Sequence, residues 1–173
     1  MSDARMLLSC GILLTALLGC SDERSARVPA PGDAAAPAPS PATVVPDVTP
    51  VDGARIAAAD SEPHNWLSHG RSYSEQRFSP LDRIDTANVG RLGLAWSFGF
   101  PTDRGMEATP IVVDGRLYVT STWSMVYAFD ATTGALLWQH DPEVPRQWAV
   151  HLCCDAVNRG VAAWGGKVFV GTI

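Results

Sequence analysis

Apolar and polar residues alternate with a period of two in several short runs between residues 92 and 139, a pattern typical of β-strands. Turn residues separate these runs at Asp114-Gly115 and at Thr133-Gly134, and Gly165-Gly166 marks a third turn further along. No sustained helical stripe is present, and only one short helical turn is expected, near residues 85–89. The pattern predicts an all-β fold, with strands at residues 92–98, 109–113, 116–120, 125–129 and 136–139 and from Lys167 onward.

Parts of this pattern repeat along the chain. Leu94-Ala95-Trp96 recurs as Leu136-Leu137-Trp138 after 42 residues, and residues 114–119 recur as residues 165–170 after 51. A period of about 40 to 50 residues with about four strands per unit is typical of a propeller blade. An ordinary β-sandwich with accidental similarity is the alternative.

The N-terminal residues form a separate kind of segment. Arg5 precedes an apolar run over residues 6–18, which is long enough for an export signal and too short to span a bilayer. The sequence LLGC, which ends at Cys20, resembles the bacterial lipobox, and the serine after it resembles the sorting pattern of outer-membrane lipoproteins. We expect a lipoprotein-type signal peptide over residues 1–20 and lipidation of Cys20. A plain secretory signal and an uncleaved hydrophobic anchor are the alternatives.

The next segment is rich in Ala, Pro, Ser and Thr and holds no aromatic residue up to residue 62. Such a composition buries too little apolar surface to offset the entropy of ordering, so residues 21–62 are expected to be a disordered tether. A Pro-rich docking peptide is the alternative. Every Trp, Tyr, Phe and His lies at or after position 64, which places the globular part at residues 63–173.

Charge excludes one class of partner. The chain has 18 acidic and 13 basic residues, for a net charge of −5 and a pI of about 5.2. This balance provides no basic surface for phosphate contacts, so no nucleic-acid partner is expected.

The adjacent cysteines Cys153 and Cys154 are the ones left for the folded part, since Cys10 and Cys20 belong to the signal segment. Export permits a disulfide. Adjacent Cα atoms lie about 3.8 Å apart, below the roughly 4.4 to 6.8 Å usual for a disulfide, so a bond between them forms a strained ring. Such a rigid, flat surface suits one face of a planar cofactor. Two reduced, buried thiols and a metal cluster with His151 as third ligand are the alternatives.

Residues 128–138, AFDATTGALLW, resemble the A-x-D-x-x-T-G-x-x-x-W tryptophan-docking motif of quinoprotein propellers. In that family the Trp of one blade packs between neighbouring blades, and the stretch from Asp to Gly forms a tight turn. The resemblance implies these roles for Trp138 and for residues 130–134. The motif indicates a fold and not an activity, because non-catalytic outer-membrane assembly scaffolds carry it too.

Three further matches resemble the catalytic branch, the methanol and ethanol dehydrogenases that depend on pyrroloquinoline quinone (PQQ). Residues 105–110, GMEATP, resemble the segment whose Glu hydrogen-bonds the quinone. Cys153-Cys154 resembles the vicinal disulfide, and residues 155–160, DAVNRG, resemble the stretch that follows it. The resemblance implies a disulfide between these cysteines and a cofactor site with one side formed by Glu107, Cys153, Cys154, Val157 and Arg159.

The chemistry of PQQ explains these residue types, because it is a flat tricyclic orthoquinone with three carboxylates. The planar guanidinium of Arg159 suits paired hydrogen bonds with a carboxylate or a quinone oxygen. The disulfide stacks on one ring face, Val157 lines the pocket and Glu107 joins its polar rim. Each residue also has a plain structural interpretation: a solvated strand end for Glu107, a surface ion pair for Arg159 and a core position for Val157.

The family's other functional residues are expected after Ile173. They are the Ca²⁺ ligands, the Asp proposed as general base and the ring on the other cofactor face; a C-terminal haem c domain is a further possibility. The family's propeller has eight blades, and the chain is expected to supply about one and a half, plus an N-terminal strand that closes the last blade. By itself, this portion is expected to be inactive, and no catalytic residue or metal ligand is assigned within it.

The resemblance implies a periplasmic enzyme, lipid-anchored to the outer or the inner membrane, that oxidises primary alcohols to aldehydes. Its partners are a small alcohol and an electron acceptor such as a cytochrome c. The alternative is a non-catalytic propeller lipoprotein that scaffolds outer-membrane assembly. Glu107, Cys153-Cys154 and Arg159 distinguish the two, because a scaffold has no need of a strained disulfide beside a cation.

We predict that Cys20 is lipidated and begins the mature chain. Mass spectrometry of the mature N-terminus is expected to show acylated Cys20, because the apolar run and the LLGC sequence together match a lipoprotein signal. A Cys20→Ser variant is expected to leave the membrane fraction. An unmodified Cys20 at the mature N-terminus, or cleavage at another position, contradicts the prediction.

Overall fold

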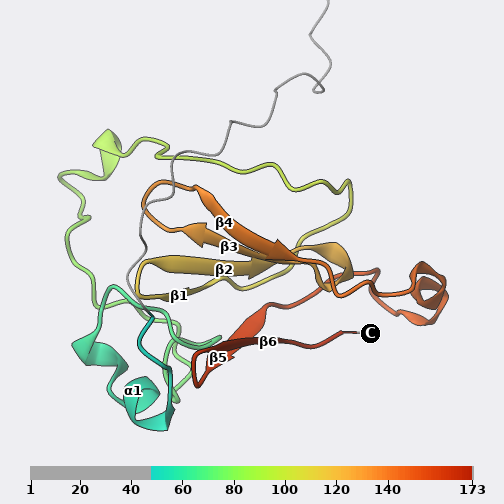
Figure 1. Cartoon of the computed structure of the whole chain (residues 1–173). Helices are drawn as coiled ribbons and strands as arrows, with labels where there is room; N and C mark the ends of the chain where they lie inside the picture. Colours follow the sequence, from blue (N-terminus) through green and yellow to red (C-terminus); the bar gives the residue numbers. More distant parts are fainter. Residues whose placement is uncertain (1–47, 173) are drawn as a thin grey trace, which may run out of the picture. The chain divides into compact units, whose positions relative to one another are not determined.

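The computed structural model describes residues 48–172, so the signal peptide, Cys20 and most of the predicted tether lie outside the described residues. Strands β1–β4 form an antiparallel sheet of four strands in chain order, and β5 and β6 form a separate antiparallel pair (Figure 1). Within the described residues, one α-helix and four 3₁₀ turns accompany these strands. In chain order the elements are α1 Gly53–Ala57, η1 Ala59–Ser61, η2 Val89–Arg91, β1 Ile111–Val113, β2 Arg116–Thr120, η3 Thr122–Ser124, β3 Val126–Asp130, β4 Leu136–His140, η4 Arg146–His151, β5 Val161–Trp164 and β6 Lys167–Val170.

The turns between strands lie where the sequence predicts them. Asp114 and Gly115 have φ angles of 48° and 76°, and Gly165 and Gly166 have 56° and 76°. Two successive left-handed residues are characteristic of type I′ hairpins, whose twist matches that of the paired strands. The all-β pattern is therefore confirmed for β1–β4, and the Gly165-Gly166 turn joins β5 to β6. None of the helices within residues 48–172 is long and apolar enough to cross a membrane.

Strand β3 is buried on both sides of the sheet. Its residue Ala128 packs with Ile111, Val113 and Tyr118 on one face, where residues of the N-terminal segment and of β5 and β6 also pack. Its neighbours Tyr127 and Phe129 pack on the opposite face against Phe98, Phe100 and Ala108. Because successive residues of a strand point to opposite faces, covering both faces requires two different parts of the chain.

The prediction of a strand at residues 92–98 is wrong for this structure. Residues 92–98 have no strand hydrogen-bonding pattern. Trp96 and Phe98 instead lie over the sheet, with ring centroids 6.0 and 4.7 Å from that of Phe129. Their alternation of apolar residues reflects packing on the face of the sheet and not pairing at its edge.

Trp96 docks on the turn that joins β3 to β4. Its indole N–H donates to the carbonyl of Ala131 over 3.2 Å, and a Cβ at Gly134 would lie 2.5 Å from its ring. The Asp130 carboxylate holds the turn by accepting from the Thr133 N–H at 2.7 Å, which lowers the pKa of Asp130. The predicted turn over residues 130–134 is confirmed, and it receives a tryptophan from the preceding repeat.

The predicted tether extends too far along the chain. Residues 53–57 form α1, and Val51, Ile56 and Leu67 belong to the buried core on the β1–β4 sheet. Asp52 caps the helix by accepting from the Arg55 N–H over 2.8 Å. Residues from Val51 onward therefore belong to the folded part. A few apolar side chains that pack on the face of the sheet are enough to hold this segment in place.

Arg55 connects this N-terminal segment to the β1–β2 hairpin. Its guanidinium donates to Glu62 at 2.7 Å and forms an ion pair with Asp114 in the hairpin turn. It also donates to the carbonyl of Thr49 over 2.6 Å, and Asp114 accepts from the Thr49 N–H over 2.8 Å. The Arg55 side chain is only 11% exposed, so this network is shielded from water.

The same network lowers the pKa of both carboxyl groups. The hydrogen bond from Arg55 is the main cause for Glu62, whose ordinary value is 4.5. Burial opposes ionisation of Asp114, but hydrogen bonds from Arg55 and Thr49 outweigh it and lower its pKa below the ordinary 3.8. A lowered pKa in the folded state stabilises the protein above the ordinary pKa, and this contribution is lost as the pH falls through the lowered value.

We predict that Arg55→Met lowers the free energy of unfolding by about 2 kcal/mol at pH 7, because two partly buried carboxylates lose their cation. Denaturant titration measures this change. The wild-type protein is expected to lose stability as the pH falls below about 4, and the variant to show a weaker loss. Arg91→Met, at an exposed position, is the control and is expected to change stability by less than about 0.5 kcal/mol. Equal stability of the two variants contradicts the prediction.

Candidate functional site

Two segments that are distant in sequence run side by side next to β1. The Thr109 N–H donates to the carbonyl of Arg159 over 3.1 Å. Gly160 has a φ of 124°, and a Cβ there would lie 2.7 Å from the Thr109 carbonyl oxygen. Only glycine permits this approach, because other residues avoid this backbone region and carry a side chain that collides.

Glu107 and Arg159 are brought together by these segments. Their side chains form an ion pair at 3.0 Å, with the Arg159 side chain 71% and the Glu107 side chain 43% exposed. An exposed pair of this kind adds little stability. A guanidinium carries five N–H donors, so Arg159 keeps donors for a ligand beyond Glu107.

Cys153 and Cys154 lie next to this ion pair. Both cysteines are exposed and free, with their Sγ atoms 2.7 Å apart in a hydrogen bond. This hydrogen bond raises the pKa of the Cys154 thiol, the charge of Arg159 opposes the rise and that of Glu107 adds to it. The disulfide that the resemblance implies is not formed here and stays a prediction. The alternative of buried thiols does not fit, because both side chains face solvent.

The described residues also form no cluster of metal ligands at the cysteines, the other alternative to a disulfide. Within residues 48–172, no three His, Cys, Asp or Glu side chains gather as possible metal ligands. The His151 ring instead lies 5.4 Å from the ring of Trp148. Val157, the fifth predicted residue, is half-buried beside buried Ala156, consistent with a lining position.

No motif in the sequence indicates a role for the turn between β2 and β3, which lies against Ala156. Trp123 has a φ of 62°, and its N–H donates to the Ala156 carbonyl over 2.9 Å. The guanidiniums of Arg104 and Arg146 lie 5.5 and 4.2 Å from the centre of its ring. A left-handed bulky residue costs about 1 to 3 kcal/mol of conformational free energy, and its surroundings must hold it in place.

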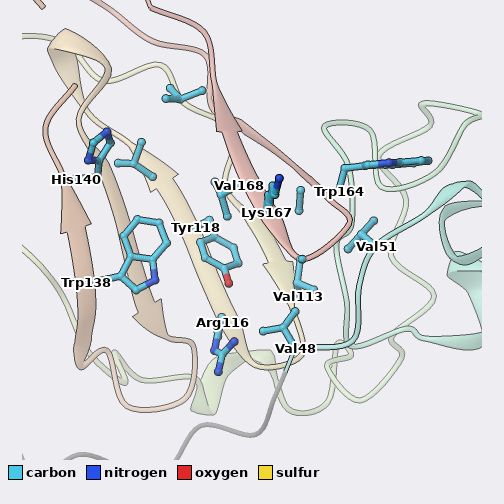
Figure 2. Close-up of a pocket in the computed structure, with 14 residues that line it drawn as sticks. Val48, Val51, Val113, Arg116, Tyr118, Trp138, His140, Trp164, Lys167 and Val168 are labelled. Carbon is cyan, nitrogen blue, oxygen red and sulfur yellow. The ribbon is translucent and has the colours of Figure 1, made fainter. Parts of the chain in front are cut away.

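A cavity of about 680 Å³ lies elsewhere, between the β1–β4 sheet and β5–β6. Tyr118, Trp138 and His140 line it from one side and Trp164 and Lys167 from the other (Figure 2). None of the five predicted cofactor residues lines it. It is the gap between two sheets, and the candidate site is instead the exposed surface at Glu107, the cysteines and Arg159.

Comparisons with known proteins show the family to which the chain belongs. Residues 66–169 match the family described as glucose/ethanol/alcohol dehydrogenase, beta-propeller domain. The chain belongs to this PQQ-dependent dehydrogenase family. It is 62% identical over 123 residues to quinohemoprotein alcohol dehydrogenase ADH-IIG of Pseudomonas putida, a match that covers 71% of the chain and 17% of that relative. The similarity confirms the quinoprotein resemblance and a partial β-propeller fold.

Solved structures of the family give the same result. A structure of ADHIIG from Pseudomonas putida HK5 matches with a TM-score of 0.72 and 60% identity, over 73% of this chain and 19% of that one. A europium-containing methanol dehydrogenase matches with a TM-score of 0.63 and 39% identity, over 69% of this chain and 21% of that one. The chain therefore spans about a fifth of the length of these structures.

The residues present fit one side of PQQ. Arg159 offers exposed cationic donors to a carboxylate, and the two exposed sulfur atoms lie beside it as a polarisable surface. Glu107 provides an acceptor next to the same cation. This donor set suits an anionic, planar cofactor, and within residues 48–172 it provides no cage for the metal ion that accompanies PQQ in this family.

We predict that Gly160→Ala lowers the free energy of unfolding by about 2 kcal/mol, because its Cβ collides with the Thr109 carbonyl and its φ disfavours alanine. Denaturant titration checks this value. Gly93→Ala is the matched control, since a Cβ there meets no atom within 4 Å. A Gly160→Ala protein as stable as the control shows that the two segments can separate freely, contrary to the contacts described above.

Proposed function

We propose that the chain is the N-terminal portion of a periplasmic, PQQ-dependent dehydrogenase that oxidises primary alcohols to aldehydes. Glu107, Cys153, Cys154, Val157 and Arg159 form one side of its cofactor pocket. The observation that carries this proposal is the ion pair of Glu107 with Arg159 beside the two cysteines. Glu107 lies 46 or more positions before the other groups in the sequence, and the relative that matches the chain over 123 residues is a quinohemoprotein alcohol dehydrogenase.

Each residue has a physical role in this proposal. Arg159 binds a carboxylate or quinone oxygen through its exposed N–H donors, and Glu107 fixes the orientation of that guanidinium through their ion pair at 3.0 Å. Cys153 and Cys154, closed into a disulfide after export, form a rigid surface against one cofactor face. Val157 excludes water from the edge of the pocket. PQQ itself supplies the two-electron acceptor that protein side chains lack.

The rest of the proposed enzyme lies in the longer protein. We infer an eight-bladed propeller whose last blade is closed by an N-terminal strand, and later blades that contribute the metal ligands and the general base. The metal is proposed to be Ca²⁺. Because a related methanol dehydrogenase contains europium, a lanthanide is the other metal to test. A haem c domain and a soluble cytochrome c are the proposed routes for electrons. Lipidated Cys20 is the proposed anchor, in the outer or the inner membrane.

A scaffold for outer-membrane assembly fits these observations less well. Such a protein needs the docking turn around Trp96 and Gly134, which the structure has. It has no use for an exposed arginine paired to a glutamate beside two cysteines. The similarity to alcohol dehydrogenases covers these residues, which lie within the matched range 66–169.

The decisive experiment measures alcohol-dependent dye reduction by the full-length protein that begins with this chain. Activity is expected with added PQQ and Ca²⁺, with a lanthanide in a separate arm, whereas residues 1–173 alone are expected to stay at the no-protein baseline. Arg159→Met is expected to weaken PQQ binding at least about tenfold, because a charge-assisted hydrogen bond is lost. Arg91→Met is the matched control and is expected to bind PQQ as the wild type does.

The same preparation tests the disulfide. Thiol counting under denaturing, non-reducing conditions is expected to find no free thiol at Cys153 and Cys154 in the mature, PQQ-loaded protein. Two free thiols contradict the stacking role of the pair. A full-length protein that neither binds PQQ nor oxidises alcohols overturns the proposed function.

A further inference from the structure

The turn between β2 and β3, residues 121–125, contacts both segments that carry the proposed cofactor residues. Its backbone is unusual, because Trp123 and Ser124 have φ angles of 62° and 59°. This left-handed region is unfavourable for a bulky aromatic side chain and persists only where neighbouring groups hold it. The turn therefore keeps a conformation that its own sequence does not favour.

On one side the turn holds the stretch that follows the cysteines. The Trp123 N–H donates to the Ala156 carbonyl over 2.9 Å. The side-chain amide of Asn158 donates to the Ser124 hydroxyl over 3.0 Å. These contacts flank Val157, so the turn fixes the chain directly before Arg159.

On the other side the turn holds the segment that leads to Glu107. The Thr122 hydroxyl donates to the Thr102 hydroxyl over 3.0 Å. The Arg104 guanidinium lies 5.5 Å from the centre of the Trp123 ring and forms an ion pair with Asp155, the residue after Cys154. Arg104 thus links the Glu107 segment to the cysteine loop across the tryptophan.

A second guanidinium completes this arrangement. Arg146, seven residues before Cys153, lies 4.2 Å from the centre of the same ring. Both cations lie within the roughly 6 Å at which an aromatic face attracts a cation. The ring and the Asp155 carboxylate together offset the repulsion between the two arginines, so an apolar side chain without a π face cannot take the place of Trp123.

We propose that Trp123 is a positioning residue, which holds the Cys153–Cys154 loop and Arg159 against the Glu107 segment. The identity of the ligand rests on the proposed function, but the positioning of the two cysteines is measurable without any ligand. Trp123 does not touch the reacting atoms in this proposal. It acts through the loop that it fixes.

The test compares three variants of the full-length protein. Trp123→Leu removes the π face, Trp123→Phe keeps an aromatic ring, and Arg146→Met removes the nearer cation from an exposed position. Trp148→Leu is the matched control, because Trp148 is a half-exposed tryptophan in η4, two residues after Arg146. Two readouts are taken: the pH profile of alkylation of Cys153 and Cys154 in the reduced protein, and the dissociation constant for PQQ.

In the wild type, the hydrogen bond between the sulfur atoms holds the pKa of Cys154 above its ordinary value, with Arg159 and Glu107 as the charges that face it. Trp123→Leu releases the loop and separates the sulfurs, so the alkylation profile is expected to move to lower pH and the rate at pH 8 to rise about threefold. Its PQQ dissociation constant is expected to rise about tenfold. Trp123→Phe is expected to restore both values to within about twofold of the wild type, and Arg146→Met to shift both in the direction of Trp123→Leu.

Two results overturn the proposal. One is a Trp123→Leu protein with the alkylation profile of the wild type and of Trp148→Leu. The other is a Trp123→Phe protein as impaired as Trp123→Leu, which shows that any change at this position acts through folding. If Trp123→Leu does not fold, Arg146→Met is tested in its place with the same two measurements, and wild-type values for both overturn the proposal. Failure of the wild type to bind PQQ overturns the proposed function alone, because the alkylation profiles still decide the positioning role.

Discussion

The structure depends on covering both faces of the β1–β4 sheet. Tyr127 and Phe129 of β3 point to one face and Ala128 to the other, and all three are at most 1% exposed. Since no single neighbouring element covers two opposite faces, the chain must return to the sheet from both sides. The segment from Val51 to Leu67 and the strands β5 and β6 cover one face, and residues 96–108 cover the other.

The position of the candidate site follows from this coverage. Ala108 packs on the face formed by Tyr127 and Phe129, which fixes the residue beside Glu107. Arg159 lies two residues before β5, whose side chains pack on the opposite face through Val161 and Ala163. The ion pair between Glu107 and Arg159 thus forms at the edge where the coverings of the two faces meet. Because both side chains are exposed, the apolar packing of the neighbouring residues positions this ion pair, and the ion pair itself adds little stability.

Two sets of polar contacts help the apolar core to position two segments of the chain. Arg55 fastens the N-terminal segment to the β1–β2 turn through Asp114, although α1 has only five residues and little stability as an isolated helix. Trp123 fastens the loop after the cysteines to the turn between β2 and β3. In both places polar contacts between residues that are distant in sequence help to determine where a segment outside the named strands lies.

The sequence by itself determined the strands β1–β4, their turns and the quinoprotein family, and it predicted the residues of the proposed site, of which Glu107 and Arg159 form an ion pair. These features depend on local periodicity, on glycines at left-handed positions such as Gly115 and Gly134, and on short motifs. Only the tertiary structure decided that residues 92–98 lie over the sheet, that residues 51–61 join the core, and that Trp123 holds the cysteine loop. Those outcomes depend on which surface a segment meets, and an alternating apolar pattern is the same whether its residues pair at an edge or pack on a face.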